Sequence, residues 1–136
     1  MKIAFYRAWN GTWLDKLISI LTLSKYSHCE IIFSDGECAS SSVRDGGIRF
    51  KYITMDEKWD VFPLNMFLNE ELMFKWFWMN IDDTYDYLGA LGALFGFDWS
   101  SDDKKYCSYA CASVLNIRPI QTPGGLFKLL KSKNFI

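Results

Sequence analysis

The sequence has no apolar run long enough to cross a membrane, and it has no excess of charge of either sign. A membrane-spanning helix needs about 20 apolar residues, whereas the apolar stretch at 87–97 is shorter and contains three glycines. The 15 lysines and arginines are balanced by 16 aspartates and glutamates, and they form no basic stripe. We therefore expect neither a transmembrane segment nor a nucleic-acid partner.

Metal-binding residue types are also scarce. The sequence has a single histidine, His28, and its four cysteines include no C-x-x-C pair. Because a structural zinc site needs four such ligands at a characteristic spacing, we expect no metal and no cofactor. Arg7 and Trp9 fall where a secretory signal peptide would carry an apolar run. We expect a cytoplasmic protein whose cysteines are free thiols.

Aromatic residues, by contrast, are plentiful. They make up 18% of the chain, with six Trp and eleven Phe, and half of all residues are hydrophobic. A chain of 136 residues is long enough to bury one core, so residues 1–136 are expected to form a single domain. The rings are expected to fill that core. The alternative is that some of them line an apolar groove.

Short apolar or alternating segments, separated by turn residues, predict β-strands in the first half of the chain. Ser-Asp-Gly at 34–36 and Arg-Asp-Gly-Gly at 44–47 are typical of tight turns. The predicted strands are 2–7, 27–33, 37–43, 48–53 and 59–64. The last four of these are expected to form a small antiparallel meander.

Helical periodicity marks residues 10–25, with Thr12 as the N-cap and Asp15 completing a variant of the capping box. Most of the second half of the chain is also predicted to be helical. The helices are expected at 69–81, 83–97, 106–115 and 126–132, with loops at 98–105 and 118–125. Strands followed by helices predict an α+β fold, in which an antiparallel sheet of four to six strands is packed with helices.

One histidine and one cysteine have the setting of a catalytic pair. Glu30 lies two residues after His28 on a predicted strand, so the two side chains leave the same face. Cys107 opens the predicted helix 106–115, where unpaired N–H groups and the helix dipole stabilise a thiolate. A thiolate beside an imidazole is the nucleophile of many covalent hydrolases, and the N–H of such a cysteine can bind the oxyanion. The alternative for His28 is a purely structural role.

The other three cysteines are expected to be structural. Cys111 lies one turn further into the helix, between two alanines, and suits packing as a small apolar residue. Cys38 lies on a predicted strand and is expected in the core. Because Cys29 is adjacent to His28, we expect it to point to the opposite face of the sheet and to be excluded from the histidine's site.

Four segments together resemble a known family. YSHCEI (26–31), DGECASSSVRDGGIR (35–49), YDYLG (85–89) and YCSYACASVL (106–115) are similar to segments of the circularly permuted papain-like hydrolases of the NlpC superfamily. The YiiX-like and phage-encoded subgroup is the nearest. The resemblance implies a permuted papain-like fold in which the histidine precedes the cysteine. It assigns the nucleophile to Cys107 and the general base to His28.

The third polar residue of that superfamily usually lies on the strand after the histidine, where Ser40 has the expected position. Glu30 is the stronger acid, although side chains two apart on one strand are separated by about 7 Å. We favour Glu30 as the group that orients His28 and keep Ser40 as the alternate. Tyr85 and Arg44 are candidates for substrate binding, against core packing and a solvated turn as their respective alternatives.

The expected function is that of a cysteine hydrolase, a peptidase or amidase, which cleaves an amide bond through an acyl-enzyme at Cys107. The expected partner is a peptide or another amide; wall peptides are the commonest substrates in the superfamily. One alternative is a lipid acyltransferase or thioesterase, as in the lecithin retinol acyltransferase branch, and an apolar groove beside Cys107 would favour it. The other is a binding or inhibitor protein on the same scaffold.

Overall fold

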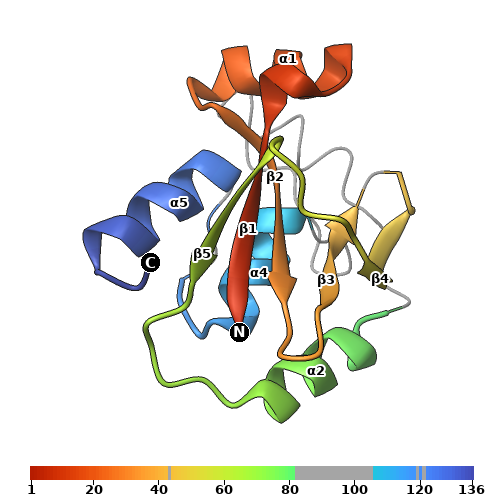
Figure 1. The fold of residues 1–136 in the computed structure, drawn as a ribbon, viewed down its shortest axis with the longest axis vertical. Helices are drawn as coiled ribbons and strands as arrows, with labels where there is room; N and C mark the ends of the chain where they lie inside the picture. The colour runs from red at the N-terminus through yellow and green to blue at the C-terminus, as the bar shows by residue number, and fades with distance from the viewer. Residues whose placement is uncertain (43, 82–105, 119, 121) are drawn as a thin grey trace.

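A five-stranded antiparallel sheet organises the molecule (Figure 1). The computed structural model describes residues 1–42, 44–81, 106–118, 120 and 122–136. The strands are β1 (Lys2–Arg7), β2 (Tyr26–Ile32), β3 (Glu37–Ser42), β4 (Gly47–Tyr52) and β5 (Trp59–Pro63), in the spatial order β4-β3-β2-β1-β5. Each predicted strand is present within one residue at either end, because alternating apolar residues and the turn at 34–36 specify both pairing and limits.

The position of β5 corrects the predicted meander. Strands β2, β3 and β4 do follow one another, but β5 lies at the far edge of the sheet and pairs with β1. The connection 53–58 crosses one face of the sheet to reach that edge. Its apolar side chains explain the crossing, because Ile53, Met55 and Trp59 pack against Ala4, Ile32 and Cys38.

Four helices accompany the sheet in the described part of the chain. They are α1 (Trp13–Thr22), α2 (Glu70–Met79), α4 (Cys107–Val114) and α5 (Pro123–Ser132), and a 3-10 turn, η1 (Ala8–Asn10), precedes α1. Helix α4 packs on β2 and β3, and α5 packs on β2 beside it (Figure 1). This architecture confirms the α+β prediction.

The helix limits follow from their caps. Asp15 accepts hydrogen bonds from the backbone N–H and the hydroxyl of Thr12, at 2.8 and 2.7 Å, which confirms the capping-box variant. At the other end of the chain, α5 begins three residues before the prediction. The Thr122 hydroxyl accepts from the N–H of Gly125, and Pro123 opens the helix, since proline has no N–H to lose in the first turn. The predicted helix 83–97 and loop 98–105 lie outside the described residues.

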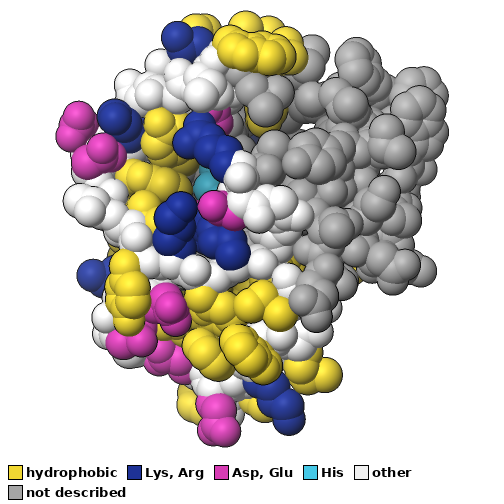
Figure 2. All heavy atoms as spheres, turned by 90° about the vertical axis from the view of Figure 1, so that its right-hand side faces the viewer, with side chains coloured by type: hydrophobic (Ala, Val, Ile, Leu, Met, Phe, Trp, Pro, Cys, Tyr) yellow, Lys and Arg dark blue, Asp and Glu magenta, His cyan; other side chains and the backbone are white. Residues whose placement is uncertain are grey.

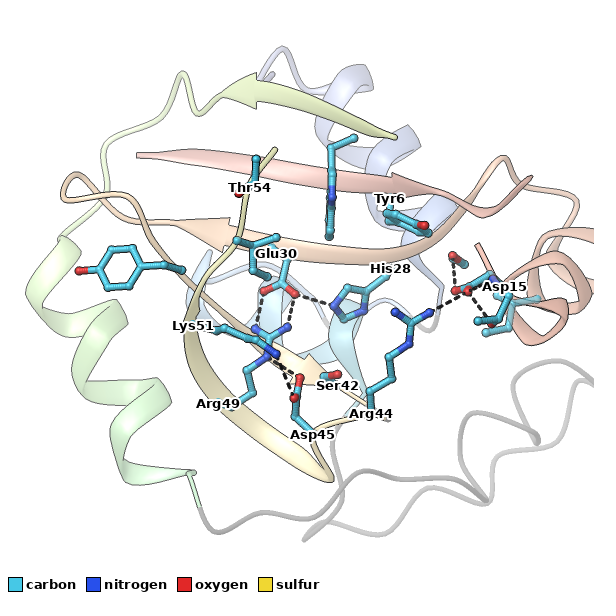
Figure 3. A pocket seen from close by; sticks show the side chains of 16 residues that line it. Tyr6, Asp15, His28, Glu30, Ser42, Arg44, Asp45, Arg49, Lys51 and Thr54 are labelled. Carbon is cyan, nitrogen blue, oxygen red and sulfur yellow. Dashed lines mark hydrogen bonds and ion pairs between the residues drawn. The ribbon is translucent and has the colours of Figure 1, made fainter. Parts of the chain in front are cut away.

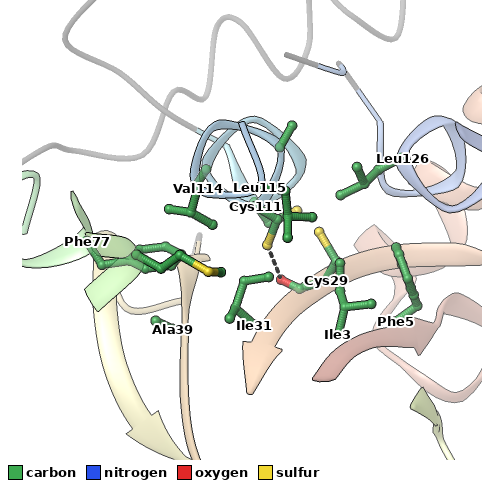
Figure 4. Close-up of a cluster of buried hydrophobic side chains, with 14 of the residues drawn as sticks. Ile3, Phe5, Cys29, Ile31, Ala39, Phe77, Cys111, Val114, Leu115 and Leu126 are labelled. Atoms are coloured by element: carbon green, nitrogen blue, oxygen red, sulfur yellow. Dashed lines mark hydrogen bonds between the residues drawn. The ribbon is translucent and has the colours of Figure 1, made fainter. Parts of the chain in front are cut away.

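The main core lies between the sheet and the helices α2, α4 and α5. Rings fill much of it: Phe5 contacts Tyr26 and Phe127, with ring centroids 5.1 and 5.5 Å apart. Figure 4 shows the aliphatic part, where Cys111 of α4 and Leu115, which follows the helix, face the strands. The expectation that aromatic residues fill the core is confirmed for these rings.

Strand β2 is irregular in two ways. Tyr6 pairs with His28 and Arg7 with Tyr26, so Ser27 is an extra residue that forms a bulge. Pairing with β3 covers only Ile31 and Ile32, and beyond that point β2 and β3 separate (Figure 1). A bulge re-aims the adjacent side chains, and the separation leaves the His28 end of β2 open toward β3 and α4.

Candidate active site

His28 and Glu30 form the centre of the candidate site. Their Nε2 and Oε1 atoms lie 2.7 Å apart, so the contact that we favoured from the sequence is present. Both side chains point to the sheet face opposite α4, where Figure 3 shows them side by side. The His28 side chain remains 21% exposed, while the Glu30 side chain is completely buried. The carboxylate can therefore fix the ring while one edge of the ring stays accessible.

Arg49 of β4 binds the other side of the Glu30 carboxylate. Its Nη1 atom lies 2.7 Å from Oε2, and Nη2 contacts Oε1, which makes a bidentate ion pair. The Nε atom donates to Asp45 at 3.0 Å. Burial by itself raises the pKa of Glu30, but the hydrogen bonds and positive charges of Arg49 and His28 outweigh it and lower that pKa. Glu30 is thus held as a buried carboxylate.

Cys107 approaches the site from the other side of the sheet. It is the first residue of α4 and is buried among core side chains. Burial lowers the pKa of His28, but the charge on Cys107 and then that on Glu30 raise it, with hydrogen bonds to both, to about 10. The charge of Cys107 and a hydrogen bond with it both act on the His28 ring, so the two side chains meet across the gap between β2 and β3.

Cys29 helps to lower the pKa of Cys107. This corrects the expectation that Cys29 is excluded from the site of His28. A hydrogen bond from the Cys29 thiol is the largest influence that holds the pKa of Cys107 well below its ordinary value; burial opposes it and the charge of His28 assists it. Cys29 does face away from His28, as expected. It nevertheless reaches Cys107, because Cys107 also lies on the core side of β2.

The pKa of Cys29 itself is raised well above its ordinary value, first by burial and then by hydrogen bonds to Cys107 and Cys111. It stays a neutral donor. Cys111 donates to the backbone carbonyl of Cys29 at 3.8 Å (Figure 4). Cys29 precedes the two residues of β2 that pair with β3. Cys111 therefore belongs to the packing of α4 on the sheet, as predicted.

Ser40, the alternate orienting residue, is completely buried in β3. Its hydroxyl contacts the carbonyl of Ser41 at 3.5 Å and the sulfur of Cys111 at 4.0 Å. The contact with the His28 ring belongs to Glu30 instead. Ser40 and Arg49 are partners in register and so share one face of the sheet, but the Ser40 hydroxyl turns toward Cys111 while Arg49 reaches Glu30.

A cleft of about 430 Å³ opens above His28 and Glu30. Figure 2 shows the histidine at the bottom of a hollow with lysine and arginine side chains beside it. The crossover 53–58 and helix α1 form two of its walls. The lining residues are Tyr6, Thr12, Asp15, Ile18, Ser27, His28, Glu30, Ser42, Arg44, Asp45, Arg49, Lys51, Tyr52, Ile53, Thr54 and Trp59.

Arg44 is one of these lining residues, so it lies where a substrate-binding role requires. Its guanidinium is largely exposed and reaches Asp15 of α1 at 3.2 Å (Figure 3). The predicted role of Arg44 is neither confirmed nor contradicted by this position. Tyr85, the other substrate-binding candidate, lies outside the described residues.

Arg49 is the residue that sequence reasoning missed. The predicted strand 48–53 alternates, and this alternation places Arg49 and Lys51 on one face, but an arginine on an edge strand is usually solvated. The predicted pairing of this strand with 37–43 was the available signal, because it brings Arg49 toward the strand that carries Glu30. The contact itself depends on the separation of β2 from β3, which the sequence does not reveal.

Neither a metal site nor a membrane span is found in the residues that the structure describes. No group of three or more His, Cys, Asp or Glu side chains there is arranged to bind a metal ion. No helix in these ranges has the length and apolar character needed to span a membrane. Comparisons with family models, curated proteins and solved structures gave no match.

Proposed function

We propose that the protein is a cysteine hydrolase that cleaves an amide bond through a covalent acyl-enzyme at Cys107. The single observation that carries this proposal is the sequence of contacts from Cys107 to His28 to Glu30, with the pKa of the thiol lowered and that of the imidazole raised. These opposite shifts favour the thiolate–imidazolium pair over the neutral thiol and imidazole. A preformed thiolate is the reactive form of cysteine.

The residues divide the reaction among them. The Cys107 sulfur attacks the carbonyl carbon of the amide, and the carbonyl electrons move to its oxygen. N–H groups in the first turn of a helix have no acceptor within the helix, so the N–H of Cys107 is available to bind this oxyanion. His28 then gives its proton to the leaving amine, the C–N bond breaks, and the acyl group remains on sulfur.

Hydrolysis of the acyl-enzyme uses the same histidine in the opposite sense. Neutral His28 takes a proton from water, hydroxide attacks the thioester carbonyl, and the carboxylic acid leaves as the thiolate returns. Glu30 occupies Nε2, which leaves Nδ1 to exchange protons with sulfur and water. A carboxylate in this position orients the ring and stabilises the imidazolium, as in other triads.

The surroundings of His28 favour an amide over a long acyl chain. Charged side chains from the β3–β4 turn and β4 flank the His28–Glu30 pair in the cleft, namely Arg44, Asp45, Arg49 and Lys51. A peptide can satisfy such groups with its own polar atoms, whereas a hydrocarbon chain would leave them without hydrogen bonds. The lipid acyltransferase is therefore an outcome of the test and not a second proposal.

The test is the rate at which iodoacetamide labels Cys107 as a function of pH, with the labelled residue identified by mass spectrometry. We expect labelling to begin well below the free-thiol pKa of about 8.5, to lose this acid-side reactivity in His28→Ala and to disappear in Cys107→Ser. Cys38→Ser is the matched control, because burial, first, and then Glu30 raise the pKa of Cys38 to about 11. It should label like the wild type.

A second experiment with the same variants identifies the class of substrate. Peptide amides and acyl thioesters are offered separately, and an acyl adduct on Cys107 is sought by mass. An adduct from peptide amides only, absent in Cys107→Ser, supports the proposal; an adduct from acyl thioesters only points to the acyltransferase. Ordinary thiol pH dependence, or label on Cys29 or Cys111 in place of Cys107, overturns the enzyme and leaves a binding protein.

A further inference from the structure

The Glu30 carboxylate has more than one charged partner, and the stronger of its ion pairs is not with the histidine. Arg49 binds both carboxylate oxygens, whereas His28 contacts Oε1 alone. Bidentate guanidinium–carboxylate pairs are directional and fix the plane of the carboxylate. The plane of Glu30 in turn fixes the direction from which the His28 ring is held.

Burial makes this arrangement necessary. The Glu30 side chain has no exposed surface, and the Arg49 side chain is mostly covered. A carboxylate without a full partner in such a place takes up a proton, because desolvation penalises the charged form. A neutral Glu30 would no longer stabilise the imidazolium of His28, and the thiolate of Cys107 would lose its counterion.

We propose that Arg49 is a positioning residue of the active site, which acts through Glu30 to keep the Cys107–His28 pair charged and aligned. This inference rests on the proposed function. Asp45 extends the same line of contacts to the rim of the cleft, since it accepts from Arg49 Nε at 3.0 Å and contacts Lys51 at 3.4 Å. The line thus runs from the β3–β4 turn, across β4 and β2, to the first residue of α4.

The other charged groups of the cleft pair with each other, Arg44 with Asp15 and Lys51 with Asp45. On β3, Cys38 senses the charge of Glu30 and Arg49 but remains a neutral thiol, with its pKa raised to about 11, mainly by burial. On the core side, Cys29 and Cys111 are buried thiols beside Cys107. The rings of Tyr6 and Trp59, from β1 and β5, lie over the His28 side of the cleft. Within the described residues, Arg49 is therefore the cation that offsets Glu30 apart from His28 itself.

The experiment measures Cys107 labelling by iodoacetamide against pH in Arg49→Met, using the full chain. We expect the acid-side midpoint to rise by about one pH unit, a tenfold loss of rate below the midpoint. Arg49→Lys keeps the charge but not the bidentate geometry, so it should restore part of the shift. Arg7→Met is the matched control, since Arg7 also pairs with a carboxylate, Asp60, on the same sheet but away from the cleft; its profile should match the wild type.

A double-mutant cycle separates positioning from general destabilisation. If Arg49 acts through Glu30, then Arg49→Met in the Glu30→Gln background should produce no further upward shift, because the neutral amide cannot be protonated in this range. The double variant replaces the buried charge pair by neutral groups, so its comparison with Glu30→Gln keeps the test available should Arg49→Met alone fail to fold.

Each outcome of the cycle either supports or contradicts the role of Arg49. An upward shift in Arg49→Met that vanishes in the Glu30→Gln background supports the inference. An unchanged profile in folded Arg49→Met, or the same shift in both backgrounds, overturns it. A wild-type protein whose Cys107 has ordinary reactivity contradicts the proposed function instead, and this result is read from the wild type before any Arg49 variant is made.

Discussion

Two arginine–carboxylate pairs lie on the same sheet and differ in how far they are buried. The buried pair, Arg49–Glu30, has side-chain exposures of 15% and 0%, and the exposed pair, Arg7–Asp60, has 47% and 13%. In both pairs a guanidinium binds one carboxylate through two nitrogen atoms. Water screens the exposed pair and can replace a lost partner, whereas nothing replaces a partner in the buried pair.

The two carboxylates also differ in what else they contact. Asp60 accepts from Lys25 at 3.1 Å and from the Tyr26 hydroxyl at 2.6 Å. These contacts fasten the edge strand β5 to the start of β2. Glu30 contacts His28, so its second partner is a group that titrates. The same pair chemistry therefore serves the fold at one edge of the sheet and, on our proposal, the reaction at its centre.

Removal of each carboxylate in turn should give the largest difference between the two pairs, and this difference is in the free energy of unfolding. Glu30→Ala leaves Arg49 and His28 without their common anion, and we expect it to lower the free energy of unfolding by about 3–5 kcal/mol. Asp60→Ala should lower it by about 1–2 kcal/mol, since Arg7 and Lys25 are exposed and one hydroxyl loses its acceptor. Urea denaturation measures both, and equal losses would remove the distinction.

Replacement of each carboxylate by its neutral amide should affect the reactivity of Cys107 at the buried pair only. Glu30→Gln weakens the support of the imidazolium, so labelling of Cys107 at neutral pH should fall about tenfold, the equivalent of one pKa unit. Asp60→Asn, the matched change at the exposed pair, should leave the rate as in the wild type. A comparable fall in both variants would mean that the rate reports stability and not the state of His28.

The coupled titration of Cys107 and His28 should give stability a plateau in pH. Folded His28 has its pKa raised to about 10, so its contribution is complete below its unfolded pKa of about 6.5 and is lost as pH rises toward 10. Folded Cys107 has its pKa lowered, so its contribution is complete above its unfolded pKa of about 8.5 and is lost as pH falls.

Between these unfolded values the folded pair holds one proton, on His28, and the unfolded chain also holds one, on sulfur. Stability from this pair is therefore flat there and falls on either side. Denaturation midpoints across this range measure it, with Asp60→Asn as the variant that should keep the plateau. A steady slope through the region would show that the folded and unfolded states bind different numbers of protons there, which contradicts the paired shifts.

The smallest expected effect lies at the outer end of the buried pair. Asp45 is partly exposed, and the hydrogen bond from Arg49 is the main cause that lowers its pKa. Asp45→Asn should destabilise the protein by about 0.5 kcal/mol and should raise the labelling midpoint of Cys107 by less than Arg49→Met does. A larger shift of the labelling midpoint in Asp45→Asn than in Arg49→Met would mean that Asp45, and not Arg49, is the residue that acts on Glu30.

The sequence predicted the elements well and their assembly only in part. Strands β1 to β5 were each found from alternation and turns, which are local signals. The place of β5 beside β1 was missed, because local patterns do not say which edge a strand will join. Similarly, Cys29 was assigned to the face opposite His28, and its contact with Cys107 depends on where α4 lies.

The sequence by itself determined the α+β order, the position of Cys107 in the first turn of a helix, and the placement of His28 and Glu30 on one face of a strand. Each of these follows from spacing along a single element. Only the tertiary structure decided that Arg49 would complete the charge balance of Glu30 and that Cys107 would reach His28 between β2 and β3. Such contacts join residues far apart in the chain, and a bulge at Ser27 and two separated strands set their geometry.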